Sequence, residues 1–454
     1  MSGRILVSAV GAVVEIDVSE LESAASEAIR DAWRDALLGY DRDPDAVVRP
    51  RTDLDDAAML SKLSTTVTLA ALEHRQGELW MLHAAGLADE RGHVVVLSAR
   101  SGTGKTTASR HLARRFAYVS DETVGIDSQG GVVAYRKPLS LIVNAGYAKD
   151  QVPVSAAVAG PELPHALRLS KVVVLDRRDD AGPHARVEPL SLADAVMALA
   201  PQSSYLTAMR SPLRTIASLL DATGGAVRVT YREAESLDGV IDALMDAEPP
   251  NDPLVARPEA RVDAATVSGA EDQDPDRWFR GPASDALDVG EGRLALLRRS
   301  QDGGKLELLD GIAPAIWRGA AGRTMEDIST GLIAEFGSPA DTVDVEALVG
   351  TRIEELAELE LLAAEPSWRI TDAAAWVGDQ ERVTVMNVAT GSQPLALDGS
   401  AAIIWTVLAD GLALRQSALL EHCVAAFDIA VDSIRADVLA LLDQLREAGV
   451  VTIR

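Results

Sequence analysis

The sequence predicts an α/β domain in its first half, followed by a small α+β module that is present twice. Three observations predict this. Strand-like and helix-like segments alternate around a glycine-rich turn between residues 65 and 245. A stretch rich in Pro, Asp, Glu and Ala, residues 248–276, has no apolar periodicity and indicates a linker. After the linker, the segment that ends at Trp317 is similar to the segment that ends at Trp405.

Composition limits the classes of partner. The chain has 454 residues and a formal net charge of −26. A surface this acidic repels nucleic acid and anionic lipid, so we expect neither as a partner. No apolar run reaches the roughly 18 residues that a membrane span needs, and the N-terminus lacks the features of a signal peptide, so we expect a cytoplasmic protein. Cys423 is the single cysteine, which excludes an intrachain disulfide.

The first domain begins with two strand-like runs, "ILVSAV" and "AVVEIDV", and a helix-like acidic segment. We expect residues 1–64 to form an α+β segment that packs on residues 65–248. In that second region a helical segment precedes the strands "LWMLHAAGLADE" and "HVVVLSA", which a polar turn at residues 89–92 joins. Further strands are expected in "FAYVSDETVGID", "VVAYRKPLSLIV" and "SKVVVLDR", and helices in "SLADAVMALAPQ" and "LDGVIDALMDA".

The stretch "ARSGTGKTT", residues 99–107, ends in the Gly-Lys-Thr of the Walker A pattern. Gly102 and Gly104 let backbone N–H groups surround an anion without a Cβ in the way. The N-terminus of a following helix adds partial positive charge. Lys105 can reach the β- and γ-phosphates of ATP, and the Thr106 hydroxyl can ligate Mg²⁺.

The context of this loop fits the motif, because a buried strand is expected over residues 93–98 and a helix over residues 106–116. Ala99 replaces the first glycine of the pattern, which the loop tolerates if φ stays negative. A glycine-rich turn without a ligand is the alternative interpretation. The expected nucleotide contacts are Ser101, Gly102, Thr103, Gly104, Lys105, Thr106 and Thr107.

An acidic pair, Asp121 and Glu122, follows the next strand-like run. Two adjacent carboxylates at a strand end can divide two tasks. One accepts a proton from an attacking hydroxyl, and the other holds Mg²⁺ directly or through water. A solvated turn or a helix cap is the alternative, since Ser-Asp-Glu commonly starts a helix.

These residues together resemble a known family. "SGTGKTT" followed by "VSDE" is similar to the P-loop kinases that include HPr kinase/phosphorylase and ATP-dependent phosphoenolpyruvate carboxykinase. "LHAAGL" places His83 upstream, where the HPr kinase group carries a histidine, and "YRKPLSL" places Lys137 and Pro138 in a segment that recurs after the acidic pair. The resemblance covers roughly residues 65 to 245 and implies an α/β P-loop kinase fold.

The resemblance also implies roles. Lys105 and Thr106 would bind phosphate and metal, and Asp121 would be the general base. Glu122 would stand where a second aspartate helps to hold Mg²⁺, and His83 would contact the transferred phosphate or the acidic pair. The implied cofactors are ATP and Mg²⁺, and a homo-oligomer is an assembly known in the family.

Several departures limit what can be carried over. The glycine-rich "E-x-R-G-x-G" signature through which HPr kinases engage their protein substrate has no counterpart, so HPr is not the expected acceptor. The metal-binding and oxaloacetate-binding parts of the carboxykinase are also missing. For Lys137, surface solvation and phosphate contact are both open, and for His83 a satisfied histidine between strands is the alternative. Lys171 is expected to be structural.

The repeated module contains "GKLELLDGIAPAIW" in the first copy and "QPLALDGSAAIIW" in the second, with the two tryptophans 88 residues apart. We expect each copy to be a strand hairpin, turning near residues 302–304 and 390–392, followed by three helices. Thr324 and Asp327 form a capping-box-like start of one helix. Two sets of residues are expected to share helix faces: Met325, Ile328, Leu332, Ile333 and Phe336 in the first copy, and Ile434, Val438, Leu441, Leu442 and Leu445 in the second.

These modules resemble the PqqD-like fold, the winged-helix recognition element of enzymes that modify ribosomally made peptides. The likeness includes a final "D-x-L-x-x-L-x-x-x-G-[LV]-[LV]" helix, which the second copy has at residues 437–451; the first copy has "ELAELELL" and lacks the glycine. Such modules bind a leader peptide as an added strand at the hairpin edge. The expected limits are a linker at 249–284 and PqqD-like domains at 285–366 and 367–454. Core packing is the expected role of Trp317 and Trp405.

The combined resemblance implies an ATP- and Mg²⁺-dependent kinase that phosphorylates a Ser or Thr hydroxyl of a peptide held by the PqqD-like domains. Tethered recognition would raise the local acceptor concentration. Two alternatives stay open. One is a non-catalytic peptide-binding scaffold with a regulatory nucleotide site, which Ala99 and Glu122 mildly favour. The other is a small-molecule hydroxyl kinase, which would not need two recognition modules.

Overall fold

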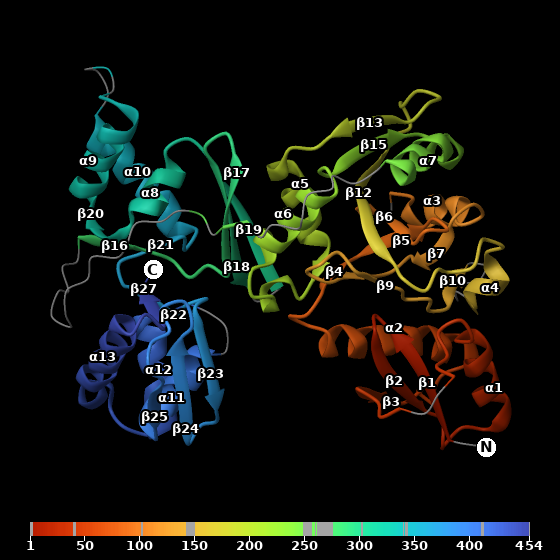
Figure 1. Cartoon of the computed structure of the whole chain (residues 1–454), viewed down its shortest axis with the longest axis horizontal. Helices are drawn as coiled ribbons and strands as arrows, with labels where there is room; N and C mark the ends of the chain where they lie inside the picture. Colours follow the sequence, from red (N-terminus) through yellow and green to blue (C-terminus); the bar gives the residue numbers. More distant parts are fainter. Residues whose placement is uncertain are drawn as a thin grey trace. The chain divides into compact units, whose positions relative to one another are not determined.

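A computed structural model gives the fold of the chain (Figure 1). The structure describes residues 3–39, 42–100, 103–141, 150–247, 257–258, 260, 276–300, 303–338, 340, 344–409 and 413–453. The chain divides into two compact units. The first is Met1–Pro258 with Ser300–Leu306, and the second is Glu259–Arg299 with Glu307–Arg454.

The first unit begins with a three-stranded sheet, in which β1 (Arg4–Ala9) pairs antiparallel with β2 (Ala12–Asp17) and β3 (Ala46–Val48) pairs parallel to β2. The two predicted strand runs are therefore confirmed. Helices α1 (Ser23–Ala32) and α2 (Asp56–His74) enclose a core with this sheet, and α2 continues across residue 64.

The central sheet of the first unit has six strands in the order β13-β15-β12-β6-β5-β7. Strands β6, β12 and β15 are parallel, whereas β5 is antiparallel to both β6 and β7, and β13 is antiparallel to β15. The strands are β5 (Ala84–Ala88), β6 (His93–Ser98), β7 (Ala117–Ser120), β12 (Arg168–Arg177), β13 (Arg186–Pro189) and β15 (Val227–Tyr231). The expected strands around the glycine loop are thereby confirmed, with the turn between β5 and β6 at the expected place.

One face of this sheet packs on α3 (Lys105–Leu112) and α7 (Asp238–Asp246) through buried aliphatic side chains such as Leu97, Leu112 and Ile241. An antiparallel sheet in the order β14-β4-β8-β9 lies in the same unit. Its strands are β4 (Trp80–Leu82), β8 (Val124–Ile126), β9 (Val132–Val133) and β14 (Ser203–Ser204). The remaining elements are β10 (Leu139–Leu141), β11 (Asp150–Val152), α4 (Val154–Ala157), α5 (Leu192–Leu199), α6 (Pro212–Ala222) and the short helices η1 (Ala200–Gln202), η2 (Leu206–Ala208) and η3 (Ala234–Leu237).

The second unit contains the duplicated module, and the order of elements in the two copies is the same (Figure 1). The first copy consists of β16 (Arg277–Arg280), β17 (Asp285–Gly290), β18 (Arg293–Ser300), β19 (Gly303–Leu309), α8 (Ala313–Gly319), β20 (Ala321–Thr324), α9 (Met325–Phe336), α10 (Val345–Glu358) and β21 (Leu362–Ala363). The second consists of β22 (Ser367–Ile370), β23 (Ala374–Gly378), β24 (Arg382–Asn387), β25 (Leu395–Asp398), α11 (Ser400–Ala409), β26 (Leu414–Arg415), α12 (Gln416–Phe427), α13 (Val431–Glu447) and β27 (Val451–Ile453).

Each copy has a three-stranded sheet, β17-β18-β19 or β23-β24-β25, where the sequence predicted only a hairpin, and a second small sheet, β20-β16-β21 or β26-β22-β27. The three helices per copy are confirmed. Trp317 and Trp405 are each 1% exposed, in agreement with a role in the core.

The helix faces agree with the prediction except at the end of α9. Thr324 and Asp327 form the expected capping box. Ile333 and Phe336, however, are 38% and 58% exposed, whereas Ile328 and Leu332 are buried in the core of this copy and Met325 packs against it. Four of the five positions expected to share the buried face of α13 are buried, and Leu441 packs partly buried against the same core.

Of the predicted linker at residues 249–284, the structure describes residues 257–258, 260 and 276–284. Of the turn expected at residues 302–304, residue 302 lies outside the described residues, whereas residues 303 and 304 already belong to β19. β16 lies within the segment assigned to the linker, residues 249–284. The turn at residues 388–391 agrees with the expected second turn. In the part of the chain that the structure describes, no helix combines the length and apolar character needed to cross a membrane.

Two glycines of the second copy have positive φ but different surroundings. Gly449, after α13, has φ +69°, and a Cβ there would lie 2.6 Å from Asn387 Nδ2. Gly391 has φ +61° and open space around it. We expect Gly449→Ala to lower the local free energy of unfolding by about 2 kcal/mol, and Gly391→Ala by about 1 kcal/mol, because only the first adds a steric contact to the backbone cost. Amide hydrogen exchange of residues 383–451 in the full chain measures both, and equal losses would contradict the contact.

Candidate active site

Three chain segments meet at one edge of the central sheet, the edge at which β6 and β7 end and β5 begins. They meet because these three strands are neighbours in the order β6-β5-β7. β5 starts directly after His83, β6 ends just before Ala99, and β7 ends just before Asp121. Ala84 pairs with Ser98 and Gly86 pairs with Ser120. An antiparallel neighbour begins where the next strand ends. The sheet therefore brings the histidine, the glycine loop and the acidic pair together.

The glycine loop leads directly into a helix, as the motif requires. Gly104 has φ +90° and forms the N-cap of α3, which begins at Lys105. A Cβ on Gly104 would lie 3.2 Å from Arg177 Cδ and 3.4 Å from Tyr231 Oη, so the position favours glycine for both its backbone and its space. Ala99 is buried and is not among the residues with positive φ, which satisfies the condition for alanine there.

The other predicted loop contacts are placed in part. Ser101 and Gly102 lie outside the described residues. Thr103 donates its hydroxyl to the carbonyl of Arg100 at 2.6 Å. Thr106 and Thr107 are exposed on the first turn of α3. A cavity of about 630 Å³ lies beside this helix, and its lining includes Thr107, Arg110, Arg114 and Glu235.

The ammonium group of Lys105 is buried and has no hydrogen-bond partner among the described residues. Burial lowers its pKa to about 8. The charges of Glu122 and Asp121 oppose this shift, and that of Lys137 adds to it. An unsatisfied cation at the start of a helix is a donor group available to an anion.

Asp121 is held by a hydrogen bond that the sequence did not reveal. The hydroxyl of Tyr118 donates to Asp121 Oδ1 at 2.6 Å, and Tyr118 is only 3% exposed. Burial and the neighbouring charge of Asp121 raise the pKa of Tyr118 well above its usual value, so the phenol stays a donor. Oδ1 of Asp121 is thereby fixed, which leaves Oδ2 for another proton donor.

Glu122 lies between the imidazole of His83 and the ammonium group of Lys137. Its Oε1 is 3.6 Å from His83 Nδ1, and its Oε2 is 3.2 Å from Lys137 Nζ. Lys137 is only 7% exposed, so solvation at the surface does not describe it. The backbone N–H groups of Glu122 and Thr123 both donate to Ser120 Oγ at 3.2 Å. This turn is followed by β8, so the acidic pair does not start a helix.

The pKa of His83 is lowered by burial and by the nearby charge of Lys105, although Glu122 opposes the shift. The imidazole is therefore mostly neutral near pH 7, when one ring nitrogen can donate and the other can accept. Its backbone N–H donates to the carbonyl of Gln202 at 2.7 Å, which anchors the segment between β4 and β5.

The edge thus brings together all three predicted catalytic residues and Glu122. Sequence reasoning missed Tyr118, Tyr231 and Arg177. The one available signal for Tyr118 was an aromatic residue three positions before Asp121, and Tyr231 and Arg177 are the last residues of strands that run parallel to β6. Lys171 donates to three carbonyls after α6, residues 223–225, in agreement with its expected structural role.

No group of three or more His, Cys, Asp or Glu side chains suited to a metal ion occurs in the described residues. The expected metal contacts, Thr106 and Glu122, could therefore supply only part of a Mg²⁺ coordination shell. Mg²⁺ commonly keeps waters and takes its remaining ligands from substrate phosphates. The residues fit a metal that arrives with a nucleotide.

A known family matches the end of the chain. The model of the family described as "Coenzyme PQQ synthesis protein D (PqqD)" matches residues 383–451, so the chain carries a PqqD domain at its C-terminal end. No curated protein matches the sequence.

Two solved structures are similar to parts of the chain. "TbiB1 in Complex with the TbiA(beta) Leader Peptide" is 20% identical, covers 18% of this chain and 93% of its own, and has a TM-score of 0.17. The HPr(Ser) kinase/phosphatase from Coxiella burnetii is 12% identical, covers 36% of this chain and 92% of its own, and has a TM-score of 0.20. With TM-scores this low, neither likeness carries an argument about this chain.

The lowered pKa of Lys105 predicts a specific pH dependence of stability. Between pH 8 and about 10.5 the unfolded chain binds more protons than the folded chain, so this lysine makes the wild type more stable as pH rises. The free energy of unfolding of Lys105→Met, taken relative to wild type, should therefore fall over this range. Urea unfolding at pH 7, 8, 9 and 10 measures it. The exposed Lys62, replaced in the same way, is the control, and a flat difference for Lys105→Met would contradict the buried ammonium.

Proposed function

We propose that this protein is an ATP- and Mg²⁺-dependent kinase that phosphorylates a Ser or Thr hydroxyl of a peptide held by its C-terminal PqqD-like part. One observation carries the proposal. The buried Lys105 ammonium lacks a hydrogen-bond partner at the start of α3, and the carboxylates of Asp121 and Glu122 lie at the same sheet edge. A phosphate cradle beside a positioned base is what phosphoryl transfer needs.

ATP would supply the phosphoryl group, and Mg²⁺ would neutralise charge on its phosphates. Lys105 and the N–H groups at the start of α3 would bind the β- and γ-phosphates. The cavity beside Thr107 has room for the nucleoside. Thr106 and Glu122 would hold the metal, while Lys137 fixes the second oxygen of Glu122.

Asp121 would accept the proton of the attacking hydroxyl through Oδ2. Tyr118 would keep the carboxylate oriented by holding Oδ1, so that the base needs no reorganisation when the acceptor arrives. His83, close to Glu122, would contact the acidic pair or the transferred phosphate.

For the peptide, we infer that the second copy of the module is the binding copy. Val385 of β24 pairs with Trp376 on one side and with Leu395 on the edge strand β25 on the other. In this cross-strand row Val385 is fully buried, whereas its two neighbours, Trp376 and Leu395, are 46% and 39% exposed. An apolar row that reaches an open edge strand suits an added peptide strand. In the first copy, the small Ala286 occupies the position of Trp376 and is fully buried.

The PqqD domain at residues 383–451 supports peptide recognition, and the resemblance implies a precursor of a ribosomally made peptide product. We propose limits of 65–248 for the kinase domain and 367–454 for the second PqqD-like domain, with residues 1–64 packed on the kinase domain. The first PqqD-like domain begins at residue 277 and not at 285, because β16 pairs with β20 and β21 of that copy.

Label transfer tests the proposed activity directly. The full chain is incubated with γ-labelled ATP, Mg²⁺ and a library of Ser- and Thr-containing peptides. We expect labelled peptide with wild type, a loss of at least about 100-fold with Asp121→Asn, and no transfer with Lys105→Ala. Lys62→Ala, the same change at an exposed lysine, should keep full activity. Peptide binding without transfer by wild type would favour the scaffold, and label on small hydroxyl compounds alone would favour a small-molecule kinase.

The hydroxyl of Tyr118 gives a second, sharper prediction. We expect Tyr118→Phe to lower kcat about tenfold with the KM for ATP unchanged, because a hydrogen bond to a charged group is lost while the phosphate cradle stays intact. Tyr135→Phe is the matched control, since this buried tyrosine bonds to Thr68 at 2.7 Å. Equal losses of kcat in both variants would indicate a general effect of removing a buried hydroxyl and would contradict the positioning role.

A further inference from the structure

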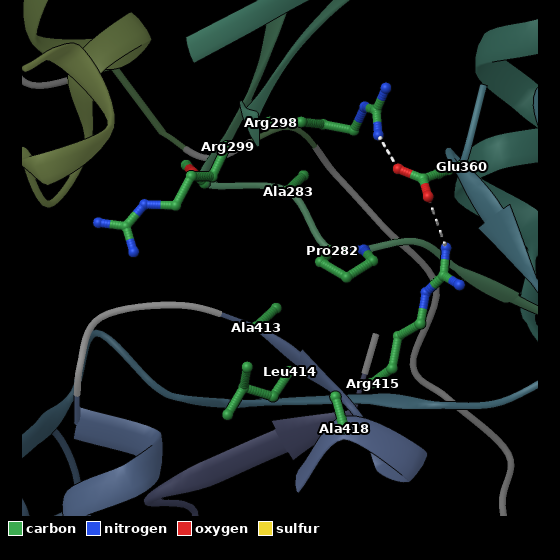
Figure 2. Close-up of a pocket in the computed structure, with 10 residues that line it drawn as sticks. Pro282, Ala283, Arg298, Arg299, Glu360, Ala413, Leu414, Arg415 and Ala418 are labelled. Carbon is green, nitrogen blue, oxygen red and sulfur yellow. Dashed lines mark hydrogen bonds and ion pairs between the residues drawn. The ribbon is translucent and has the colours of Figure 1, made fainter. Parts of the chain in front are cut away.

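A cavity of about 210 Å³ lies in the second unit, where the two copies of the module meet. Figure 2 shows Arg298 and Arg415 directed at the carboxylate of Glu360, whereas Arg299 points away from it. Arg298 Nη1 is 3.0 Å from Glu360 Oε2, and Arg415 Nη2 is 4.0 Å from Glu360 Oε1. Arg299, Ser284 and five apolar residues complete the lining: Pro282, Ala283, Ala413, Leu414 and Ala418.

Glu360 occupies a backbone position that favours glycine. It follows α10 with φ +56°, and Gly449 follows α13 in the same way with φ +69°. In both copies the next amide donates to the carbonyl five residues back, so the two helices end in the same turn. Glycine adopts this φ without steric cost, and glutamate does not. The first copy therefore has a glutamate at a position where the positive φ favours glycine.

Arg298 also differs from its counterpart in the second copy. It ends the buried row of β18, as Asn387 ends that of β24, and the two are 8% and 7% exposed. The amide of Asn387 donates to the backbone carbonyl of Gly449 at 2.9 Å. Arg298 instead pairs with the side chain of Glu360. The first copy thus has an ion pair where the second copy has a side-chain-to-backbone hydrogen bond.

Arg415, in the second copy, also differs from the residue at the equivalent position of the first copy. It pairs with Ser367 as Thr324 pairs with Arg277, so Arg415 and Thr324 are equivalent positions. Thr324 caps α9 with its side chain, whereas Arg415 makes no capping hydrogen bond to α12. Both Glu360 and Arg415 therefore stand where the other copy has the residue better suited to the local backbone.

We propose that this cavity binds a carboxylate side chain of an acidic peptide segment, which takes the place of Glu360 between Arg298 and Arg415. Arginine matches a carboxylate in geometry as well as charge. The side chain of Arg298 is 10% exposed and its Nε is buried without a hydrogen-bond partner, so it requires a counter-charge. Glu360 is 65% exposed, which makes one carboxylate easy to exchange for another.

The space around Glu360 and Arg415 is large enough for more than one residue of a bound peptide. In the described part of the chain, the one charged partner of Arg415 is Glu360, at the outer limit of an ion pair. A second cavity of about 440 Å³ shares both residues with the first. The proposal rests on peptide recognition by this part of the chain and is independent of phosphoryl transfer.

Binding of defined probes, without ATP, tests this site separately from catalysis. Fluorescein-labelled Leu-Glu-Leu-Glu-Leu and Leu-Gln-Leu-Gln-Leu, blocked at the C-terminus, are titrated with the full chain at about 0.15 M salt, which screens the net charge of −26. We expect the Glu probe to bind about tenfold more tightly. Glu360→Gln should tighten its binding several-fold, because the internal competitor loses its charge. Arg415→Gln should weaken its binding about tenfold, and Arg299→Gln should leave it within twofold.

Three results would overturn the proposal. Equal binding of both probes would show that no carboxylate is recognised. Weaker binding by Glu360→Gln would make Glu360 a contact for the peptide and not its stand-in. Equal losses with Arg299→Gln and Arg415→Gln would reduce the effect to general attraction by positive charge.

Discussion

The candidate active site depends on one constraint, the placement of the Lys105 ammonium in a buried position with no hydrogen-bond acceptor. Burial opposes this charge, and the two carboxylates after β7 oppose the resulting shift in pKa. Glu122 is itself held between the His83 imidazole and the Lys137 ammonium, so two ammonium groups and two carboxylates lie close together in the site. An unpaired buried charge is costly, and a bound polyanion would satisfy the Lys105 ammonium, which lacks a hydrogen-bond partner among the described residues.

In the second unit, the two copies of the module share one order of elements but differ at equivalent positions. The second copy keeps glycine and asparagine where its helix end meets its sheet, and it exposes an apolar row beside its edge strand. The first copy has an ion pair at the equivalent place and a small buried residue in the equivalent row. Divergence at matching positions points to different tasks for copies that share one fold.

Much of the site could be predicted from the sequence because its parts are local. The glycine loop, the helix after it and the acidic pair each follow a strand, and strand ends meet at a sheet edge whatever fills the rest of the fold. Tyr118 and Lys137 could not be assigned, since their importance comes from burial beside carboxylates, which depends on tertiary packing. The missing glycine at Glu360 was visible in the sequence, but only the side-chain contacts in the structure show that its carboxylate meets Arg298 and Arg415. The exposed end of α9 was mispredicted because helical spacing does not show where the neighbouring helices end.

The most direct measurement of the central claim is a crystal structure of the full chain with Mg²⁺ and a non-hydrolysable ATP analogue. The account predicts a triphosphate against the N–H groups that precede Thr106, with Lys105 on its outer phosphates and Asp121 facing the terminal phosphorus. An empty cradle, or Asp121 turned to solvent and far from the triphosphate, would contradict it.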